Sequence, residues 1–114
     1  MVKVYVAGAY SAKDVVNVLR NIGRGETYCA DLFVDGFAPY CPWHDKDFVL
    51  RHPEADFTVE QFYQFSIEWL KVCDVMFLVP GWENSKGTLA EIEIAKANNI
   101  PIYDNYEQLI MEQI

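Results

Sequence analysis

The sequence lacks several features that would place it in a specialised class of protein. No apolar run approaches the roughly 18 residues that a membrane-spanning helix needs. Cysteine is scarce, and the three that occur are Cys29, Cys41 and Cys73, at spacings that suit no zinc motif. Because their number is odd, they do not form a simple disulfide framework either. We therefore expect no metal, no membrane span and the reducing environment of the cytoplasm.

Basic residues are also in short supply. The chain has 9 Lys and Arg against 17 Asp and Glu, a formal net charge of −8. Binding to a nucleic-acid polymer requires a basic face that neutralises phosphates, so this composition argues against such a partner. A small nucleotide remains compatible, because it needs only local dipoles and one or two donors. The first residues run directly into a strand-like segment without the apolar core of a signal peptide, so none is expected.

Apolar residues are plentiful: they make up 52% of the chain, and 15% of it is aromatic. A chain of 114 residues fits a single domain, spanning residues 1–114. Folding should bury roughly two-thirds of the surface of the unfolded chain. We expect it to fold without a metal, a disulfide or a cofactor.

The pattern of apolar residues alternates between strands and helices. Short β-branched and aromatic runs predict strands over residues 2–7, 37–41, 75–79 and 100–103. Apolar spacing of 3.6 residues and capping residues predict helices in the intervening stretches and over residues 106–114. This alternation predicts a single-domain α/β fold of Rossmann or flavodoxin type. It would be a three-layer sandwich with a mostly parallel sheet in the order 2-1-3-4.

Some details of this fold are expected from local signals. Val15, Val16, Val18, Leu19 and Ile22 should form the inward face of the first helix. Gly23 and Gly25 should weaken that helix, so that it bends or splits before residue 28. Residues 43–57 show no period and are expected to form a long loop, at most with a helical turn. Thr58 and Gln61 form a capping-box pattern that should begin the next helix, and Gly36 suits the end of the first.

The segment from Asp74 to Glu91 has the arrangement of a binding site. An apolar strand ends at Pro80-Gly81, a polar turn follows, and Glu91 lies on the first turns of the next helix. In an open α/β sheet, ligands bind at the carboxyl ends of the strands. Helix amides at the same place suit an anion. We expect the helix start to keep Glu91 ionised at neutral pH.

Three segments together resemble the nucleoside 2-deoxyribosyltransferase superfamily, most closely its small, phage-associated branch. They are VYVAGAYS near the start, GFAPYCP in the middle, and EWLKVCDVMFLVPGWENSKGTLAEIEIA followed by IPIYD. The most specific element is S-x-G-T-x-x-E after a C-D-apolar strand. The resemblance implies cleavage of the N-glycosidic bond of deoxynucleosides or their monophosphates. A glutamate, here Glu91, would attack the anomeric carbon, and water or a second base would resolve the intermediate.

The resemblance also assigns a set of substrate-binding residues. The turn after the first strand would lie against the sugar or a 5′-phosphate, and a second turn would supply hydroxyls and amides beneath the ligand. Trp43 and His44 would shape the base pocket together with Tyr10. The implied substrate-binding set comprises Gly8, Ala9, Tyr10, Ser11, Trp43, His44, Ser66, Ser85, Gly87 and Thr88. Tyr5 is near the site in the family, although a strand tyrosine is more often simply part of the core.

The chain departs from the family at one position. Family members often carry an aspartate eight residues before the strand-leading aspartate, and here that position is Ser66. Glu68, Asp45 or His44 could substitute for it. Glu93 is a rival to Glu91, but it lies about 200° around the helix and is expected to be solvated. Asp74 itself is expected to be structural.

Three hypotheses therefore remain after the sequence alone. The first is an N-glycosidase or deoxyribosyltransferase acting on a small nucleoside or nucleotide. The second is a non-catalytic module that binds a nucleotide, which the serine at position 66 favours. The third is a structural or oligomer-forming domain with an unused site. In each case we expect a homodimer or higher homo-oligomer, because 17 aromatic residues in a small domain can leave an apolar patch exposed.

Overall fold

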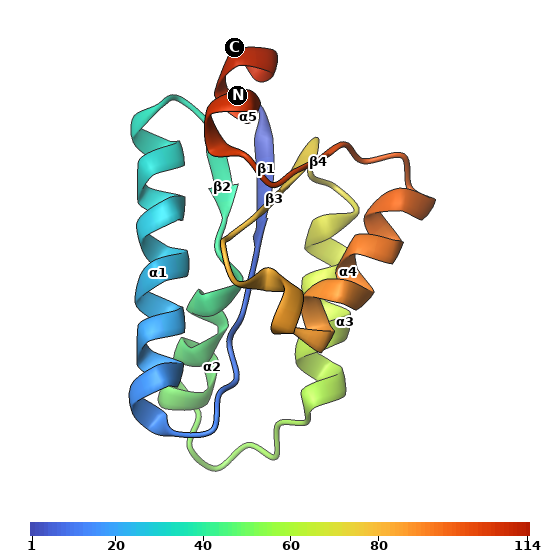
Figure 1. The fold of residues 1–114 in the computed structure, drawn as a ribbon. Helices are drawn as coiled ribbons and strands as arrows, with labels where there is room; N and C mark the ends of the chain where they lie inside the picture. Colours follow the sequence, from blue (N-terminus) through green and yellow to red (C-terminus); the bar gives the residue numbers. More distant parts are fainter.

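A four-stranded parallel sheet organises the molecule (Figure 1). The computed structural model describes all residues, 1–114. Its strands are β1 (Lys3–Ala7), β2 (Ala38–Tyr40), β3 (Val75–Leu78) and β4 (Ile102–Tyr103), and their order in the sheet is β2-β1-β3-β4. Every neighbouring pair is parallel, with β1 and β3 in register from Val4 opposite Val75 to Ala7 opposite Leu78. The predicted strand order is confirmed.

Helices cover both faces of the sheet, as Figure 1 shows. The α-helices are α1 (Val15–Val34), α2 (Lys46–Arg51), α3 (Val59–Leu70), α4 (Lys86–Ala97) and α5 (Tyr106–Gln113), with 3-10 turns η1 (Pro42–Asp45) and η2 (Trp82–Asn84). Val4 and Val6 point to a core shared with α1 and α5. Tyr5 and Ala7 point to the opposite core, shared with α3 and α4. The three-layer α/β architecture is thus confirmed, and the pleat of β1 assigns alternate residues to two separate cores.

Helix α1 is continuous, so the expected bend or split is wrong. It runs unbroken over 20 residues through both glycines. Gly25 is buried because the Trp43 ring lies against it, and a Cβ there would come within 2.5 Å of three ring atoms. Nothing lies within 4 Å of a Cβ built at Gly23. Packing against Trp43, rather than a weak helix, explains the glycine at position 25.

The first turns of α1 do not form the expected inward face. Val15, Val16 and Leu19 are 68%, 51% and 61% exposed. Val18 is half-buried, and Ile22 is the first of the expected residues that is buried. The apolar spacing was recognised correctly, but of the expected residues in the first two turns Val18 alone packs against the core.

The stretch expected to be a long loop is instead partly helical. It contains η1 and α2, and only residues 52–58 between α2 and α3 lack a helix. Neither short element buries a full apolar stripe, and α2 has no buried residue at all, which explains why no period is visible in the sequence.

The capping signals were predicted correctly. Thr58 and Gln61 form both hydrogen bonds of a capping box at the start of α3. Gly36 follows α1 with a φ of 95°, which favours glycine. No helix combines the length and the apolar character that crossing a membrane would require.

Candidate functional site

A cavity of about 930 Å³ lies at the carboxyl ends of the strands. Its walls come from the end of β1 and the turn that follows it, from η1 and α2, from α3, and from the first turns of α4. In Figure 1 this is the lower end of the sheet, opposite the two chain termini. The chain continues from β1 to β2 on one side of the sheet and from β3 to β4 on the other, so the topological switch point lies between β1 and β3. Open α/β folds bind ligands at the carboxyl ends of the strands at such a point.

The cavity brings together most of the residues predicted from the sequence. Those that line it are Gly8, Tyr10, Ser11, Trp43, Ser66, Ser85, Gly87, Thr88 and Glu91. Ala9 and His44 do not line it. Segments that are far apart in the sequence therefore meet around one space that includes Glu91.

Glu91 is paired with a tyrosine at the inner end of the cavity. The Tyr5 hydroxyl donates a hydrogen bond to Glu91 Oε2, joining β1 to α4. Tyr5 is fully buried and belongs to the core, as its residue type suggested, but its hydroxyl also contacts the candidate nucleophile. The pleat of β1 is the signal that indicates this, because Tyr5 shares a face with Ala7, which lines the cavity.

Burial changes the ionisation of Glu91. Desolvation raises its pKa from 4.5 to about 7, the hydrogen bond from Tyr5 opposes that rise, and the negative charge of Asp45 adds to it. The expectation that the helix start keeps Glu91 fully ionised at neutral pH is therefore wrong. Glu91 lies on the second turn of α4, beyond the first-turn reach of the helix dipole, and burial dominates.

Ser66 occupies the position where the family aspartate was expected. It is buried on α3 and lines the cavity. Its hydroxyl interacts with the Tyr5 hydroxyl and lowers the pKa of Tyr5, while burial and the Glu91 charge raise that pKa well above its ordinary value. Tyr5 therefore stays a neutral hydrogen-bond donor, next to Ser66 on one side and Glu91 on the other.

Trp43 is a wall of the site rather than a surface for stacking a base. It is 1% exposed and packs against Gly25, and a Cβ at Gly8 would come within 3.2 Å of its ring. Its indole Nε1 donates a hydrogen bond to the Ala9 carbonyl at 3.1 Å. The Trp43 side chain thereby fixes the turn after β1, and Ala9 contributes a backbone anchor.

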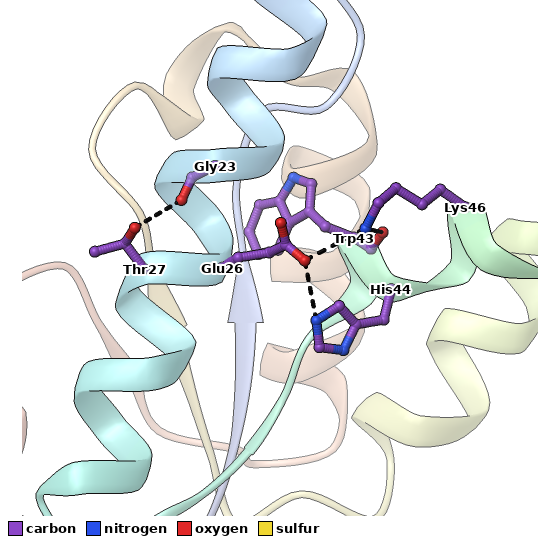
Figure 2. Close-up of polar contacts among 6 residues, drawn as sticks. All are labelled: Gly23, Glu26, Thr27, Trp43, His44 and Lys46. Atoms are coloured by element: carbon purple, nitrogen blue, oxygen red, sulfur yellow. Dashed lines mark hydrogen bonds and ion pairs between the residues drawn. The ribbon is translucent and has the colours of Figure 1, made fainter.

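His44 turns away from the cavity. Its Nε2 lies 3.1 Å from a Glu26 carboxylate oxygen on α1, and the Lys46 ammonium lies 3.3 Å from the same oxygen (Figure 2). Lys46 also donates a hydrogen bond to the Trp43 carbonyl at 3.4 Å. The structure thus uses His44 to hold η1 against α1 and not to contact a base.

The start of α4 offers polar groups to the cavity. Ser85 caps the helix, its hydroxyl accepting a hydrogen bond from the Thr88 amide at 3.2 Å. Thr88 lines the cavity, and its hydroxyl is buried without a hydrogen-bond partner in the protein. Buried hydroxyls are almost always paired, so this one is suited to a polar group of a ligand. Lys86 adds a positive charge at the same edge.

Asp45 is a second carboxyl in the cavity, at the end of η1 and across from α4. Burial raises its pKa, and the Tyr10 hydroxyl and the Lys46 ammonium act in the opposite direction. Of the three suggested substitutes for the family aspartate, Asp45 alone lines the cavity; Glu68 bonds Gln64 on an exposed face of α3.

The other acids near the motif have structural roles. Asp74 accepts a hydrogen bond from the Lys3 amide at 2.8 Å, tying the start of β3 to β1. Glu93 is exposed, with Lys96 3.8 Å away, as expected for a solvated acid. No group of three or more histidine, cysteine or acidic side chains is placed to hold a metal ion.

Comparison with known proteins assigns the chain to a family. No curated protein matches the chain. One family profile matches residues 44–104, more than half of the chain, and this stretch contains Asp45, Ser66 and Glu91. The description of the family names no activity. The chain belongs to the family described as "Domain of unknown function (DUF4406)".

Proposed function

We propose that this protein cleaves the N-glycosidic bond of a deoxynucleoside, a nucleoside or a nucleoside monophosphate, with Glu91 as the nucleophile. The observation that carries the proposal is a partly buried carboxyl, hydrogen-bonded to Tyr5, in a cavity at the carboxyl ends of a parallel sheet. Perturbed carboxyls in such cavities are typical of catalytic sites. The resemblance to nucleoside 2-deoxyribosyltransferases supplies the reaction class.

The chemistry requires a carboxylate that can approach the anomeric carbon. In the first step, a Glu91 oxygen bonds to that carbon as the bond to the base breaks. In the second, water or another base displaces Glu91 and restores the carboxylate. Because the pKa of Glu91 is about 7, a large fraction is ionised at neutral pH, and the Tyr5 hydroxyl stabilises that fraction.

The size and lining of the cavity support a small substrate. A volume of about 930 Å³ lies at the upper end of the range for small-molecule sites, and it can hold a nucleoside or nucleotide. The free Thr88 hydroxyl, the Lys86 ammonium and the α4 amides suit the sugar hydroxyls or a 5′-phosphate. The apolar residues of α2 and α3 suit the flat face of a base.

A non-catalytic nucleotide-binding module is the second candidate, and Ser66 favours it. Without the family aspartate, the site lacks the expected partner of Glu91 on α3. Such a module would bind a nucleotide in the same cavity and release no base.

One experiment separates the two candidates. The purified protein is incubated with a panel of deoxynucleosides, nucleosides and their monophosphates, with and without a second base as acceptor. Chromatography then follows free base, with Glu91→Gln in parallel and Glu93→Gln as the matched control. Base release by the wild type and by Glu93→Gln, but not by Glu91→Gln, is the expected result. A rise in melting temperature without any release of base would instead favour the binding module.

A further inference from the structure

Cleavage of a glycosidic bond usually uses two groups, a nucleophile and a proton donor for the leaving group. A base that leaves without a proton carries negative charge, which makes it a poor leaving group. Ser66 on α3 stands where the nucleoside 2-deoxyribosyltransferases that the chain resembles often carry an aspartate, so this position provides no carboxyl group. A proton donor must therefore come from another wall of the cavity.

Asp45 is placed to do this by an unusual local arrangement. It occupies the N-cap position of α2, where an aspartate would ordinarily accept a hydrogen bond from the helix amides. Here its backbone is helical, with φ −64° and ψ −20°, and its side chain makes no capping bond. The carboxyl is thus left free of the helix that it precedes, and it lines the cavity.

The turn that carries Asp45 is fixed by contacts with α1. His44 and Lys46, its two chain neighbours, both contact the Glu26 carboxylate on α1 (Figure 2). Trp43 is buried beneath the turn. These contacts hold the turn against α1, and Asp45 lines the cavity from this fixed turn.

The groups that face Asp45 suit a residue that exchanges a proton. The Tyr10 hydroxyl and the Lys46 ammonium lie beside it, and Glu91 is near enough across the cavity that the charge of Asp45 raises the pKa of Glu91. The site therefore contains two tyrosine–carboxyl pairs, Tyr5 with Glu91 and Tyr10 with Asp45. Two interacting carboxyls in one cavity release their protons in separate steps, so over an interval of pH they hold one proton between them.

We propose that Asp45 is the proton donor to the leaving base and the proton acceptor for the water that resolves the intermediate. This assignment rests on the proposed glycosidic function. Asp45, at the end of the 3-10 turn η1 after β2, then supplies the second carboxyl of the reaction in place of the one missing from α3.

Each step then balances. A Glu91 oxygen forms a bond to the anomeric carbon, the carbon–nitrogen bond breaks with its electron pair on the base, and the Asp45 proton moves to a ring nitrogen of that base. Water next attacks the same carbon, its proton passes to the Asp45 carboxylate, and the carbon–oxygen bond to Glu91 breaks. Both carboxyls return to their starting states. Because the charge of Asp45 raises the pKa of Glu91, the reactive arrangement, with the proton on Asp45 and the charge on Glu91, is the less populated of the two, and the Tyr5 hydrogen bond stabilises it.

The test compares leaving groups that differ in their need for a proton. 2′-Deoxyguanosine and 2′-deoxyinosine, with their 5′-monophosphates, are each supplied with and without a methyl group at N7. A 7-methyl purine already carries a positive charge and leaves as a neutral base without a proton donor. Release of base is measured for the wild type, Asp45→Asn and Asp47→Asn, and spontaneous release is subtracted with Glu91→Gln. Asp47 is the matched control, because it is exposed, lies two residues away and does not line the cavity.

We expect Asp45→Asn to slow release of the unmethylated bases by about 10²–10⁴-fold, the usual contribution of general acid–base catalysis. Release of the 7-methyl bases should stay within about tenfold of the wild type, a difference that misfolding would not produce. Asp47→Asn should match the wild type on both.

Two results would overturn the proposal in distinguishable ways. If Asp45→Asn slows both kinds of substrate equally, or slows neither, while Glu91→Gln abolishes release, the glycosidic function stands and Asp45 is not the proton donor. If the wild type releases no base above the Glu91→Gln background, either from these substrates or from the wider panel of deoxynucleosides, nucleosides and monophosphates, the proposed function fails and the role of Asp45 fails with it.

Discussion

Glu91 is a residue that the fold holds in an environment unfavourable to its charge. Its pKa is about 7 in the folded protein against about 4.5 when the side chain is free in solution. Below pH 4.5 the carboxyl is protonated in both states, so the stability associated with this shift is fully present. Between pH 4.5 and 7, the unfolded chain releases the proton while the folded chain still binds it. That stability is therefore lost between these two pH values.

The substitution Glu91→Gln should remove this dependence. Glutamine keeps the shape and can still accept the Tyr5 hydrogen bond, but it does not titrate. We expect the free energy of unfolding of the variant, relative to wild type, to increase by up to about 3 kcal/mol between pH 4 and pH 8. Urea unfolding at both pH values measures the change. A wild type and Glu91→Gln pair that respond identically to pH would contradict a buried Glu91, and Glu93→Gln provides the exposed control.

Tyr5 should act through Glu91. In Tyr5→Phe the ring still packs against Tyr40, whose centroid is 5.5 Å away, but the donor to Glu91 is lost. Because that hydrogen bond lowers the pKa of Glu91, its removal should raise this pKa above about 7. The acidic limb of a pH–rate profile should move to higher pH, and the rate at pH 7 should fall. Tyr40→Phe is the control, and an unchanged profile in Tyr5→Phe would show that the hydroxyl does not tune Glu91.

At the scale of the elements, the contact between α1 and η1 supports one wall of the cavity. Gly25→Ala should destabilise the protein by about 1–3 kcal/mol, because the new methyl group overlaps the Trp43 ring. Gly23→Ala, on the same helix with open space beside it, should instead stabilise by about 0.5–1 kcal/mol. Chemical denaturation of the two variants measures both effects. Equal changes in the two would mean that helix propensity, and not the Trp43 contact, determines the outcome.

This pair of glycines also shows how far elements can be predicted from the sequence. Local propensity identified the four strands and the capping box at Thr58, because burial and capping leave periodic signals. It failed at Gly25, where the deciding contact is made by Trp43, eighteen positions away along the chain. It also failed in residues 43–57, because α2 buries no residue and leaves no periodic signal. Propensity describes a residue and its near neighbours, whereas this helix is completed by a side chain from another element.

At the scale of the whole molecule, the sequence predicted which segments meet at the cavity better than it predicted the orientation of individual side chains. The motif around Glu91 and the turn after β1 meet at one cavity because carboxyl ends of parallel strands share one edge of the sheet. The orientation of individual side chains could not be predicted in the same way. The Trp43 ring packs against Gly25 as a wall of the cavity, and His44 contacts Glu26 outside the cavity lining. Asp45 lines the cavity between two chain neighbours that both contact Glu26.

The mouth of the cavity presents an apolar surface that has no cover within the chain. We call these residues the rim; each lines the cavity and is between 45% and 66% exposed: Leu19, Val49, Leu50, Val59 and Tyr63. The exposed Val15 and Val16 precede the rim on α1. Contiguous exposed apolar surface of this kind usually marks an interface, so we predict that a second copy of the chain covers the rim.

Light scattering on the purified protein tests this prediction directly. A mass at least twice that of one 13.2 kDa chain is expected. Leu19→Glu should shift the mass toward a single chain, because it adds a charge to the rim of a molecule whose net charge is already −8. Met111→Glu is the matched control: the residue is 80% exposed, but α5 lies at the opposite end of the sheet in Figure 1. A wild-type mass of one chain would contradict the prediction, and an equal effect of both variants would place the interface away from the rim.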